Sequence, residues 1–234
     1  MTRSNDEVRA ISAEIYGWLD PRETDLLYQT ALGIPEDGII VEVGSFQGRS
    51  TVVFAIAAQE RGSKVYAVDH YSGNGTDLIV TSEDLNKLRA NLEKNGLTDT
   101  VEIIVSASVD AAAQFDGEID LLFLDGSHQH EDVKADLAAW SPKVRGKIAM
   151  HDTSGNWKGV SQALEEFLAE GDWVVTDRAD ATSVLERVKP FNNNWPDDQE
   201  EKTKYNYQAD VHGTNVPGRG ASVSKTPKSK KANK

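Results

Sequence analysis

The stretch that decides the fold is Ile39-Ile40-Val41-Glu42-Val43-Gly44-Ser45-Phe46-Gln47-Gly48-Arg49-Ser50-Thr51. An apolar run ends in an acid, a turn bounded by two glycines follows, and a helix is predicted to begin after the second glycine. A strand, a tight loop and a helix N-terminus in this order hold nucleotide-like ligands at the carboxyl edge of parallel sheets in α/β proteins. The stretch therefore predicts an α/β domain with a ligand at this turn.

The glycine spacing distinguishes two candidate ligands, a dinucleotide and S-adenosylmethionine. A dinucleotide fingerprint needs a glycine two residues after the first, but that position is Phe46, and the next glycine position holds Arg49. S-adenosylmethionine has no phosphate and needs close backbone approach only at Gly44 and Gly48. We expect Glu42 to face the cationic end of this ligand. A buried strand followed by a plain glycine turn is the alternative.

A second acid supports a ligand that contains adenosine. Lys64-Val65-Tyr66-Ala67-Val68-Asp69 has the pattern of a strand that ends in a carboxylate. An acid at this place downstream of the loop is suited to accept hydrogen bonds from both ribose hydroxyls. A solvated aspartate at a strand end is the alternative for Asp69.

Composition limits the class of protein. The chain has 234 residues, 38% of them hydrophobic, no cysteine and a net charge of −13, which predicts one domain without disulfides or thiolate metal sites. The segment from Val211 to Lys234 holds six basic residues and no acid, so the remainder carries −19. We expect no nucleic-acid partner for such an acidic body. The sequence shows no charged start followed by a long apolar run, so we also expect no membrane partner and a cytoplasmic location.

The pattern along the chain predicts a doubly wound α/β fold, with a mostly parallel sheet and helices on both faces. Residues 1–34 are predicted as an N-terminal helical cap, residues 35–189 as the ligand-binding domain and residues 190–234 as a disordered tail with a basic end. The predicted strands are Ile39–Val43, Val65–Val68, Val101–Val105, Ile119–Leu124, Lys147–Met150, and a hairpin of Trp173–Thr176 and Ser183–Val188. The predicted helices are Glu7–Leu19, Arg22–Leu32, Ser50–Arg61, Glu83–Asn95, Val109–Phe115, Glu131–Trp140 and Val160–Glu170.

Polar side chains follow the fourth and fifth predicted strands, at the edge that also holds Gly44. If these strands are neighbours, Asp125, His151 and Asp152 converge on one point and are suited to bind Mg²⁺ or Mn²⁺. His128 lies one short loop away and is the candidate base, because an imidazole titrates near neutral pH. Structural roles are the alternative for each residue alone, as turn and helix caps or as a core histidine.

These motifs together resemble the class I S-adenosylmethionine-dependent methyltransferases, and within them the group of macrolide-sugar O-methyltransferases and cephalosporin-hydroxylase-like proteins. The resemblance spans residues 17–188. It implies a seven-stranded sheet of the Rossmann-like methyltransferase fold with an antiparallel last strand. It also implies a set of cofactor-binding residues, namely Glu42, Gly44, Ser45, Gly48, Ser50, Asp69, Ser106, Ser108 and Asp125, with Ser106 and Ser108 near the adenine.

The sequence thus predicts a methyltransferase that transfers a methyl group to a hydroxyl of a small molecule or sugar, assisted by a metal ion. In relatives that bind metal an acid stands at the position of His151, so this chain departs from their pattern there. Two other functions stay open. His128, His151 and a carboxylate could bind ferrous iron in an oxygenase-like site, or the domain could bind cofactor or partner without catalysis. A homo-oligomer is also left open.

Overall fold

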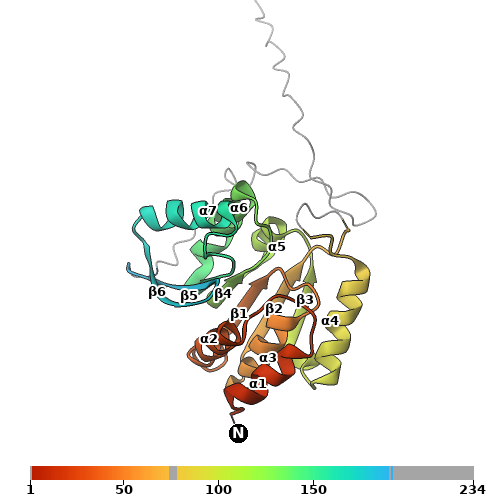
Figure 1. The fold of residues 1–234 in the computed structure, drawn as a ribbon. Coiled ribbons are helices and arrows are strands. Elements are labelled where there is room, and N and C mark those ends of the chain that lie inside the picture. The colour runs from red at the N-terminus through yellow and green to blue at the C-terminus, as the bar shows by residue number, and fades with distance from the viewer. Residues whose placement is uncertain (1, 74–77, 190, 192–234) are drawn as a thin grey trace, which may run out of the picture.

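The computed structural model describes residues 2–73, 78–189 and 191. Seven strands form one sheet in the order β3-β2-β1-β4-β5-β7-β6, and helices cover both faces (Figure 1). The predicted tail from residue 190 onward lies outside the described residues, apart from residue 191. No helix in the described part of the chain is long and apolar enough to cross a membrane.

The sheet is parallel except at its last strand, as the sequence predicted. Strands β1, β2, β3, β4 and β5 pair in parallel, whereas β7 runs antiparallel to both β5 and β6. The strands are β1 (Ile39–Val43), β2 (Lys64–Asp69), β3 (Val101–Val105), β4 (Ile119–Leu124), β5 (Val144–Met150), β6 (Trp173–Ala179) and β7 (Thr182–Arg187).

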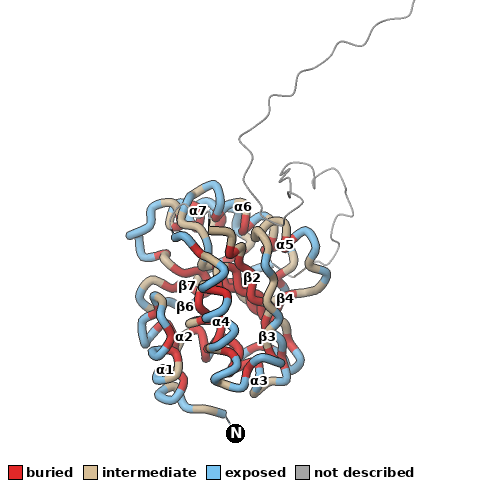
Figure 2. The backbone as a smooth tube through the Cα atoms, turned by 90° about the vertical axis from the view of Figure 1, so that its right-hand side faces the viewer, coloured by how far each residue is buried: buried red, intermediate tan, exposed pale blue. Residues whose placement is uncertain are grey.

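Two apolar clusters lie on the two faces of the sheet, and the buried residues follow the strands and the inner sides of the helices (Figure 2). Helices α1 to α4 pack on one face, where Phe54 and Phe123 meet at 5.3 Å between ring centroids. Helices α5 to α7 cover the other face around Trp140, which is fully buried. The helices are α1 (Asn5–Ala13), α2 (Pro21–Leu32), α3 (Arg49–Arg61), α4 (Ser82–Lys94), α5 (Ser108–Gln114), α6 (His130–Trp140) and α7 (Lys158–Ala169), with short 3-10 turns at Thr98–Thr100 and Ser141–Lys143.

The first two helices share an apolar cluster with α3, because Val8, Leu27 and Tyr28 are fully buried in it. Helix α2 begins with a capping box in which Asp20 and Glu23 satisfy each other's backbone amides, and Pro21 follows the cap. The division into a helical cap and a main domain at residue 34 stays a prediction.

The prediction of a helix over residues 7–19 was wrong at its end. Helix α1 stops at Ala13, and the chain then runs without helical structure to α2. Arg49 donates hydrogen bonds to the carbonyls of Gly17 and Leu19, at 2.6 and 2.8 Å, which fixes this segment against the start of α3. Trp18, predicted as part of the apolar helical face, is therefore 60% exposed.

Candidate active site

The glycine turn after β1 packs directly against the turn after β4. Gly44 has φ of +90°, a conformation that side chains disfavour, and a Cβ there would lie 2.1 Å from the carbonyl oxygen of Asp125. Its amide donates to the carbonyl of Val68 at 2.9 Å. The first glycine is thus required both by conformation and by space, and it brings β1, β2 and β4 together at one edge.

Gly48 ends the turn and begins α3. Its φ of +89° is left-handed, and a Cβ there would lie 2.4 Å from Cδ1 of Leu88. No side chain caps this helix. The free amides of the first turn of α3 are therefore available to a carboxylate or another anion.

Asp69, the predicted ribose ligand, holds the glycine turn in place. Its Oδ2 accepts hydrogen bonds from the amides of Ser45 and Phe46 at 3.1 and 2.9 Å, and its Oδ1 accepts from the amide of His70 at 2.7 Å. An ionised carboxylate offers about four acceptor positions. Asp69 therefore joins the ends of β1 and β2 and retains acceptor capacity for a ligand.

Glu42 lies on the α3 side of β1 and is fully buried. Ser50 Oγ donates to its Oε1 at 2.5 Å, and Thr51 Oγ1 donates to its Oε2. Burial raises the pKa of Glu42 to about 8, against the two hydroxyl hydrogen bonds, which lower it. Glu42 is therefore largely protonated at neutral pH unless a cationic ligand approaches.

Ser106 and Ser108, predicted to lie near an adenine, follow β3. The amide of Ser106 donates to the carbonyl of Asp69 at 3.1 Å, so this segment adjoins the same edge. Ser108 Oγ accepts a hydrogen bond from Nε1 of Trp140 at 2.9 Å and also bonds the carboxyl of Asp136. Burial raises the pKa of Asp136 to about 7. Whether either serine contacts a cofactor stays a prediction.

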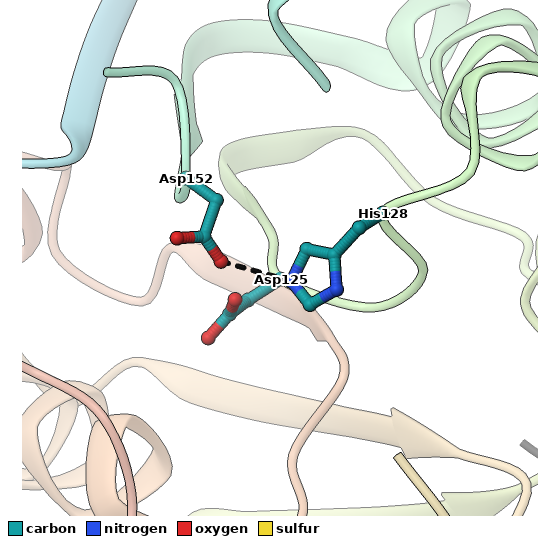
Figure 3. A group of neighbouring side chains, drawn as sticks. All are labelled: Asp125, His128 and Asp152. Carbon is teal, nitrogen blue, oxygen red and sulfur yellow. Dashed lines mark hydrogen bonds and ion pairs between the residues drawn. The ribbon is translucent and has the colours of Figure 1, made fainter. Parts of the chain in front are cut away.

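The ends of β4 and β5 bring a group of acids and imidazoles together. Leu124 pairs with Met150, and the amide of His151 donates to the carbonyl of Leu124 at 3.0 Å. Asp125 and Asp152 therefore emerge side by side, and the loop after β4 turns His128 toward them (Figure 3).

Three side chains of this group could hold a metal ion. Each of Asp125, His128 and Asp152 offers one ligand atom, and these atoms lie within 4.8 Å of one another. Nε2 of His128 lies 2.9 Å from Oδ2 of Asp152. Asp152 has φ of +59°, a strained conformation of the kind that clusters at functional sites.

His151, predicted as a metal ligand, lies behind the two aspartates and is buried. Its Nδ1 is 3.1 Å from Oδ1 of Asp125 and 3.1 Å from Oδ2 of Asp152, and its Nε2 is 3.3 Å from Oε1 of Glu23. Burial lowers the pKa of His151, but the three carboxylates outweigh it and raise the pKa to about 12. His151 is therefore an imidazolium, which has no lone pair to offer a metal, and its metal-ligand role stays a prediction.

The pKa values of Asp125 and Asp152 shift in opposite directions, although the charge of His151 lowers both. Burial raises the pKa of Asp125, and the charge of His151 opposes the rise. Burial also acts to raise the pKa of Asp152, but hydrogen bonds from His128 and His151 place it well below its usual range. Asp152 is thus ionised throughout the physiological range.

Two further residues belong to the site but were missed in the sequence. The position of Glu23 matches a capping box, which accounts for it locally. Its Oε1 also accepts hydrogen bonds from the amide of Ala181 at 2.9 Å and from the hydroxyl of Thr182. Trp157 stacks on His128 with ring centroids 4.0 Å apart and an interplanar angle of 13°. No spacing rule signals either contact, because both join segments distant in sequence.

The fold and the glycine turn define a domain of the class I S-adenosylmethionine-dependent methyltransferase type. Residues 41–153 match a family described as a methyltransferase domain. An uncharacterized protein of Sinorhizobium fredii, y4gI, is 31% identical over 127 residues. That match covers 49% of this chain and 13% of the relative, so the chain spans a small part of that protein's length.

Solved structures share the fold at low sequence identity. The O-methyltransferase NovP has a TM-score of 0.61 with 17% identity, covering 72% of this chain and 81% of NovP. The O-methyltransferase TomG of Streptomyces achromogenes, in complex with S-adenosylmethionine, has a TM-score of 0.61 with 14% identity, covering 81% and 92%. An O-methyltransferase of Bacillus cereus, in complex with S-adenosylhomocysteine, has a TM-score of 0.56 with 18% identity, covering 79% and 90%.

Proposed function

We propose that the chain is an S-adenosylmethionine-dependent O-methyltransferase that acts on a hydroxyl of a small molecule. The observation that carries the proposal is the contact between the turn after β1 and the turn after β4, where Gly44 packs on the backbone of Asp125. A turn suited to a methyl donor thus adjoins a base and two carboxylates. The methyltransferase family match and the O-methyltransferases of the same fold support this assignment.

The donor site would be formed by the glycine turn and the acid of β2. S-adenosylmethionine, when bound, supplies the methyl group. Gly44 and Gly48 allow the backbone to approach the amino-acid part, while the uncapped start of α3 favours its carboxylate. Glu42 would become ionised beside the cationic end, and Asp69 would accept hydrogen bonds from the ribose.

His128 would remove the proton from the acceptor hydroxyl. Its Nδ1 is buried, whereas its Nε2 points at Asp152. Because Asp152 is ionised, Nε2 donates to it at 2.9 Å in this structure. An acceptor hydroxyl would have to replace this hydrogen bond; Nε2, in its unprotonated tautomer, would then take the hydroxyl proton, and Asp152 would stabilise the resulting imidazolium. Trp157 stacks on the ring and fixes its plane. The contact of Nε2 with Asp152 fixes the direction of the ring edge.

Asp125 and Asp152 are the residues we assign to a divalent cation, with Mg²⁺ or Mn²⁺ as the candidates. The donor set fits, because carboxylate oxygens suit these ions and the ligand atoms lie close enough together. Such a cation, when bound, lowers the pKa of a hydroxyl. His128 Nε2 cannot be ligand and base at once, so we assign it the role of base.

The alternative iron site receives less support. Such a site requires two histidines and a carboxylate. Among the described residues, the side chains close enough together to bind one ion are Asp125, His128 and Asp152, which include one histidine. The second histidine, His151, directs Nε2 to Glu23 on α2.

Calorimetry with S-adenosylhomocysteine, with and without MnCl₂, would test the proposal. We expect binding that is weakened by Asp69→Ala and left nearly intact by Asp125→Asn, and no binding of NAD. Binding of Mn²⁺ should be lost in Asp125→Asn and kept in Asp132→Asn, which changes an exposed aspartate on the following helix. Tight NAD binding without any response to S-adenosylhomocysteine would overturn the donor assignment.

Methyl transfer to a panel of hydroxyl compounds would test the base. His128→Ala should lower the rate most at neutral pH and recover partly at higher pH, where the hydroxyl ionises without help. His130→Ala is the matched control, because His130 pairs with Glu131 and Glu166 and lies outside the group. Equal losses in the two variants would contradict the assignment of His128.

A further inference from the structure

Glu23, in the first turn of α2, is buried more deeply than a helix cap requires. It is 3% exposed, although the amide that it caps belongs to Asp20 near the surface. Glu7 occupies the same position in the capping box of α1, yet Glu7 is exposed and its carboxylate bonds Ser4. Burial of a carboxylate costs free energy unless the group is paired and hydrogen-bonded. Capping alone therefore does not account for the place of Glu23.

The carboxylate of Glu23 joins two distant segments to its own helix. Its Oε1 accepts hydrogen bonds from the amide of Ala181 at 2.9 Å and from the hydroxyl of Thr182 at 3.1 Å, where β7 begins. Its Oε2 accepts from the amide of Asp20 at 2.8 Å. Nε2 of His151, at the end of β5, lies 3.3 Å from Oε1 and 3.4 Å from Oε2. Each of these partners presents a donor, so the arrangement suits an ionised carboxylate with two acceptor oxygens.

His151 connects Glu23 to the two aspartates of the active site. Its Nδ1 lies 3.1 Å from Oδ1 of Asp125 and 3.1 Å from Oδ2 of Asp152. Phe123, which is fully buried, meets the imidazole at an angle of 67° with ring centroids 6.5 Å apart. Because the imidazole ring is rigid and packed in this way, a change at Nε2 also moves Nδ1. The position of Glu23 is thus transmitted to both aspartates.

The charges around His151 depend on one another. Asp125 and Asp152 repel each other when both are ionised, and the imidazolium between them opposes this repulsion. With Glu23 the group has three carboxylates and one imidazolium, and this excess of negative charge is suited to a divalent cation. Arg49 also attracts Glu23, but its guanidinium donates to two backbone carbonyls at the start of α3. Glu23 therefore contributes to the acid group without lying among the atoms that could contact an ion.

We propose that Glu23 is a positioning residue of the active site, which acts through His151 to hold Asp125 and Asp152 in place. The inference rests on the proposed function and extends its site to the N-terminal helix α2. Loss of the charge of Glu23 should weaken the binding of a divalent cation. Binding of the methyl donor should be unchanged, because Glu23 contacts neither Gly44 nor Asp69 in the structure.

Calorimetry with MnCl₂ on the full chain tests the proposal. Glu23→Gln removes the charge but keeps an acceptor for the cap, since glutamine also serves at this position of capping boxes. We expect the Kd of Mn²⁺ to rise about tenfold, the lower end of the range for residues that orient metal ligands. The Kd of S-adenosylhomocysteine should not change. Glu7→Gln is the matched control, because Glu7 has the same place in an exposed cap, and it should change neither Kd.

Two further variants separate positioning from stability. Thr182→Val removes a hydroxyl that donates to Glu23 but leaves the carboxylate facing His151, so it should lower the melting temperature and leave the Kd of Mn²⁺ nearly unchanged. Glu23→Asp keeps the charge, and Asp84 shows that aspartate can serve at this position of a capping box. It should recover part of the lost Mn²⁺ affinity. If the Kd of Mn²⁺ follows the melting temperature across all variants, Glu23 only stabilises the fold and the proposal is wrong.

A double-mutant cycle tests the route through His151. In a His151→Gln background the ring that joins the two carboxylate groups is gone, so the effect of Glu23→Gln on the Kd of Mn²⁺ should become severalfold smaller. An effect of equal size in both backgrounds would show that Glu23 does not act through His151, and it would overturn the proposal.

The ring nitrogens of His151 give a measurement that needs neither cofactor nor metal. In ¹H–¹⁵N spectra assigned with His151→Gln, Glu23→Gln should shift the Nε2 signal and also the Nδ1 signal, which reports on the two aspartates. Thr182→Val should leave the Nδ1 signal nearly in place. An unshifted Nδ1 signal in Glu23→Gln would overturn the proposal. Failure of the wild-type protein to bind Mn²⁺ would refute the metal assignment of the proposed function, whereas a shifted Nδ1 signal would still support the positioning of the aspartates by Glu23.

Discussion

The two halves of the active-site edge are built by different forces. On the loop side, the turn from Gly44 to Gly48 is held by backbone hydrogen bonds, and Asp69 receives three amides. On the acid side, Asp125, Asp152 and Glu23 surround the imidazolium of His151. The loop side is fixed by chain geometry, whereas the acid side is a balance of charges.

This difference matters for function. A turn set by backbone conformation keeps its shape when pH or ions change, which suits the binding of a large cofactor. A group of carboxylates around one cation adjusts to a second cation or to a proton, because each charge shifts the pKa of its neighbours. We therefore expect steric substitutions to damage the loop side and charge substitutions to damage the acid side.

The largest effect is expected for Gly44→Ala. The new Cβ would lie 2.1 Å from the Asp125 carbonyl, in a left-handed conformation, so unfolding in urea should show a loss of about 3 kcal/mol or more. Gly96→Ala is the control, because Gly96 has φ of +67° but no atom within 4 Å of a Cβ, and it should lose only about 1–2 kcal/mol. Equal losses would mean that conformation, and not the contact between the two halves, makes Gly44 necessary.

The next effect is expected for Asp125→Asn, which removes a counter-ion of a buried imidazolium. Urea unfolding at pH 7 should show a loss of about 2–3 kcal/mol. MnCl₂ should raise the melting temperature of the wild type and not that of the variant. The control is Asp132→Asn, whose carboxylate accepts a hydrogen bond from Ser127 on the surface and should cost little. A fully stable variant would show that His151 is neutral.

The sheet could be predicted from the sequence because each strand is a short apolar run between turn residues. The sequence left open whether β4 and β5 are neighbours; their pairing in the structure brings Asp125 and Asp152 together. The antiparallel β7 agrees with the resemblance to methyltransferases. Local patterns thus locate the strands along the chain and the polar residues at their ends, but not which strands are neighbours.

The partners of the site residues could not be predicted in the same way. His151 was expected at the metal, but its environment depends on Glu23, which lies 128 residues earlier and is read locally as a helix cap. Trp18 was assigned to a helix because its spacing continues that of Ile11 and Ile15. The chain leaves the helix at Ala13 instead, and Arg49, 31 residues further along than Trp18, fixes the segment there.

A smaller effect is expected from Glu42, a fully buried titrating group on the loop side. Its pKa is raised by burial to about 8 in the fold, so the folded state binds more protons than the unfolded state between roughly pH 4.5 and 8. Its contribution to stability is therefore complete below about pH 4.5 and is lost as the pH rises through 8. In Glu42→Gln the unfolding free energy should therefore vary less over this range.

Urea titrations at half-unit pH intervals would measure this dependence. In Asp136→Asn the unfolding free energy should vary less with pH up to about pH 7, since burial raises the pKa of that carboxyl to about 7. The upper pH at which the effect ends therefore distinguishes the two variants. Addition of S-adenosylmethionine should reduce the effect in the wild type, because a cation beside Glu42 favours its ionised form. A curve for Glu42→Gln that parallels the wild type would show that Glu42 is ionised in the free protein.

The smallest effect is expected for Trp157→Leu, which tests whether the acid side also depends on a geometric contact. Stacking on His128 holds the ring at 4.0 Å, and such contacts contribute about 0.5–1.5 kcal/mol. Because Trp157 is 42% exposed, its loss should leave the fold intact and lower kcat about three- to tenfold, with the KM for S-adenosylmethionine unchanged. Trp157→Phe keeps a flat ring and should recover most of the rate. A rise in the KM of the acceptor with constant kcat would instead place Trp157 against the substrate, and His128 would then be positioned by Asp152 alone.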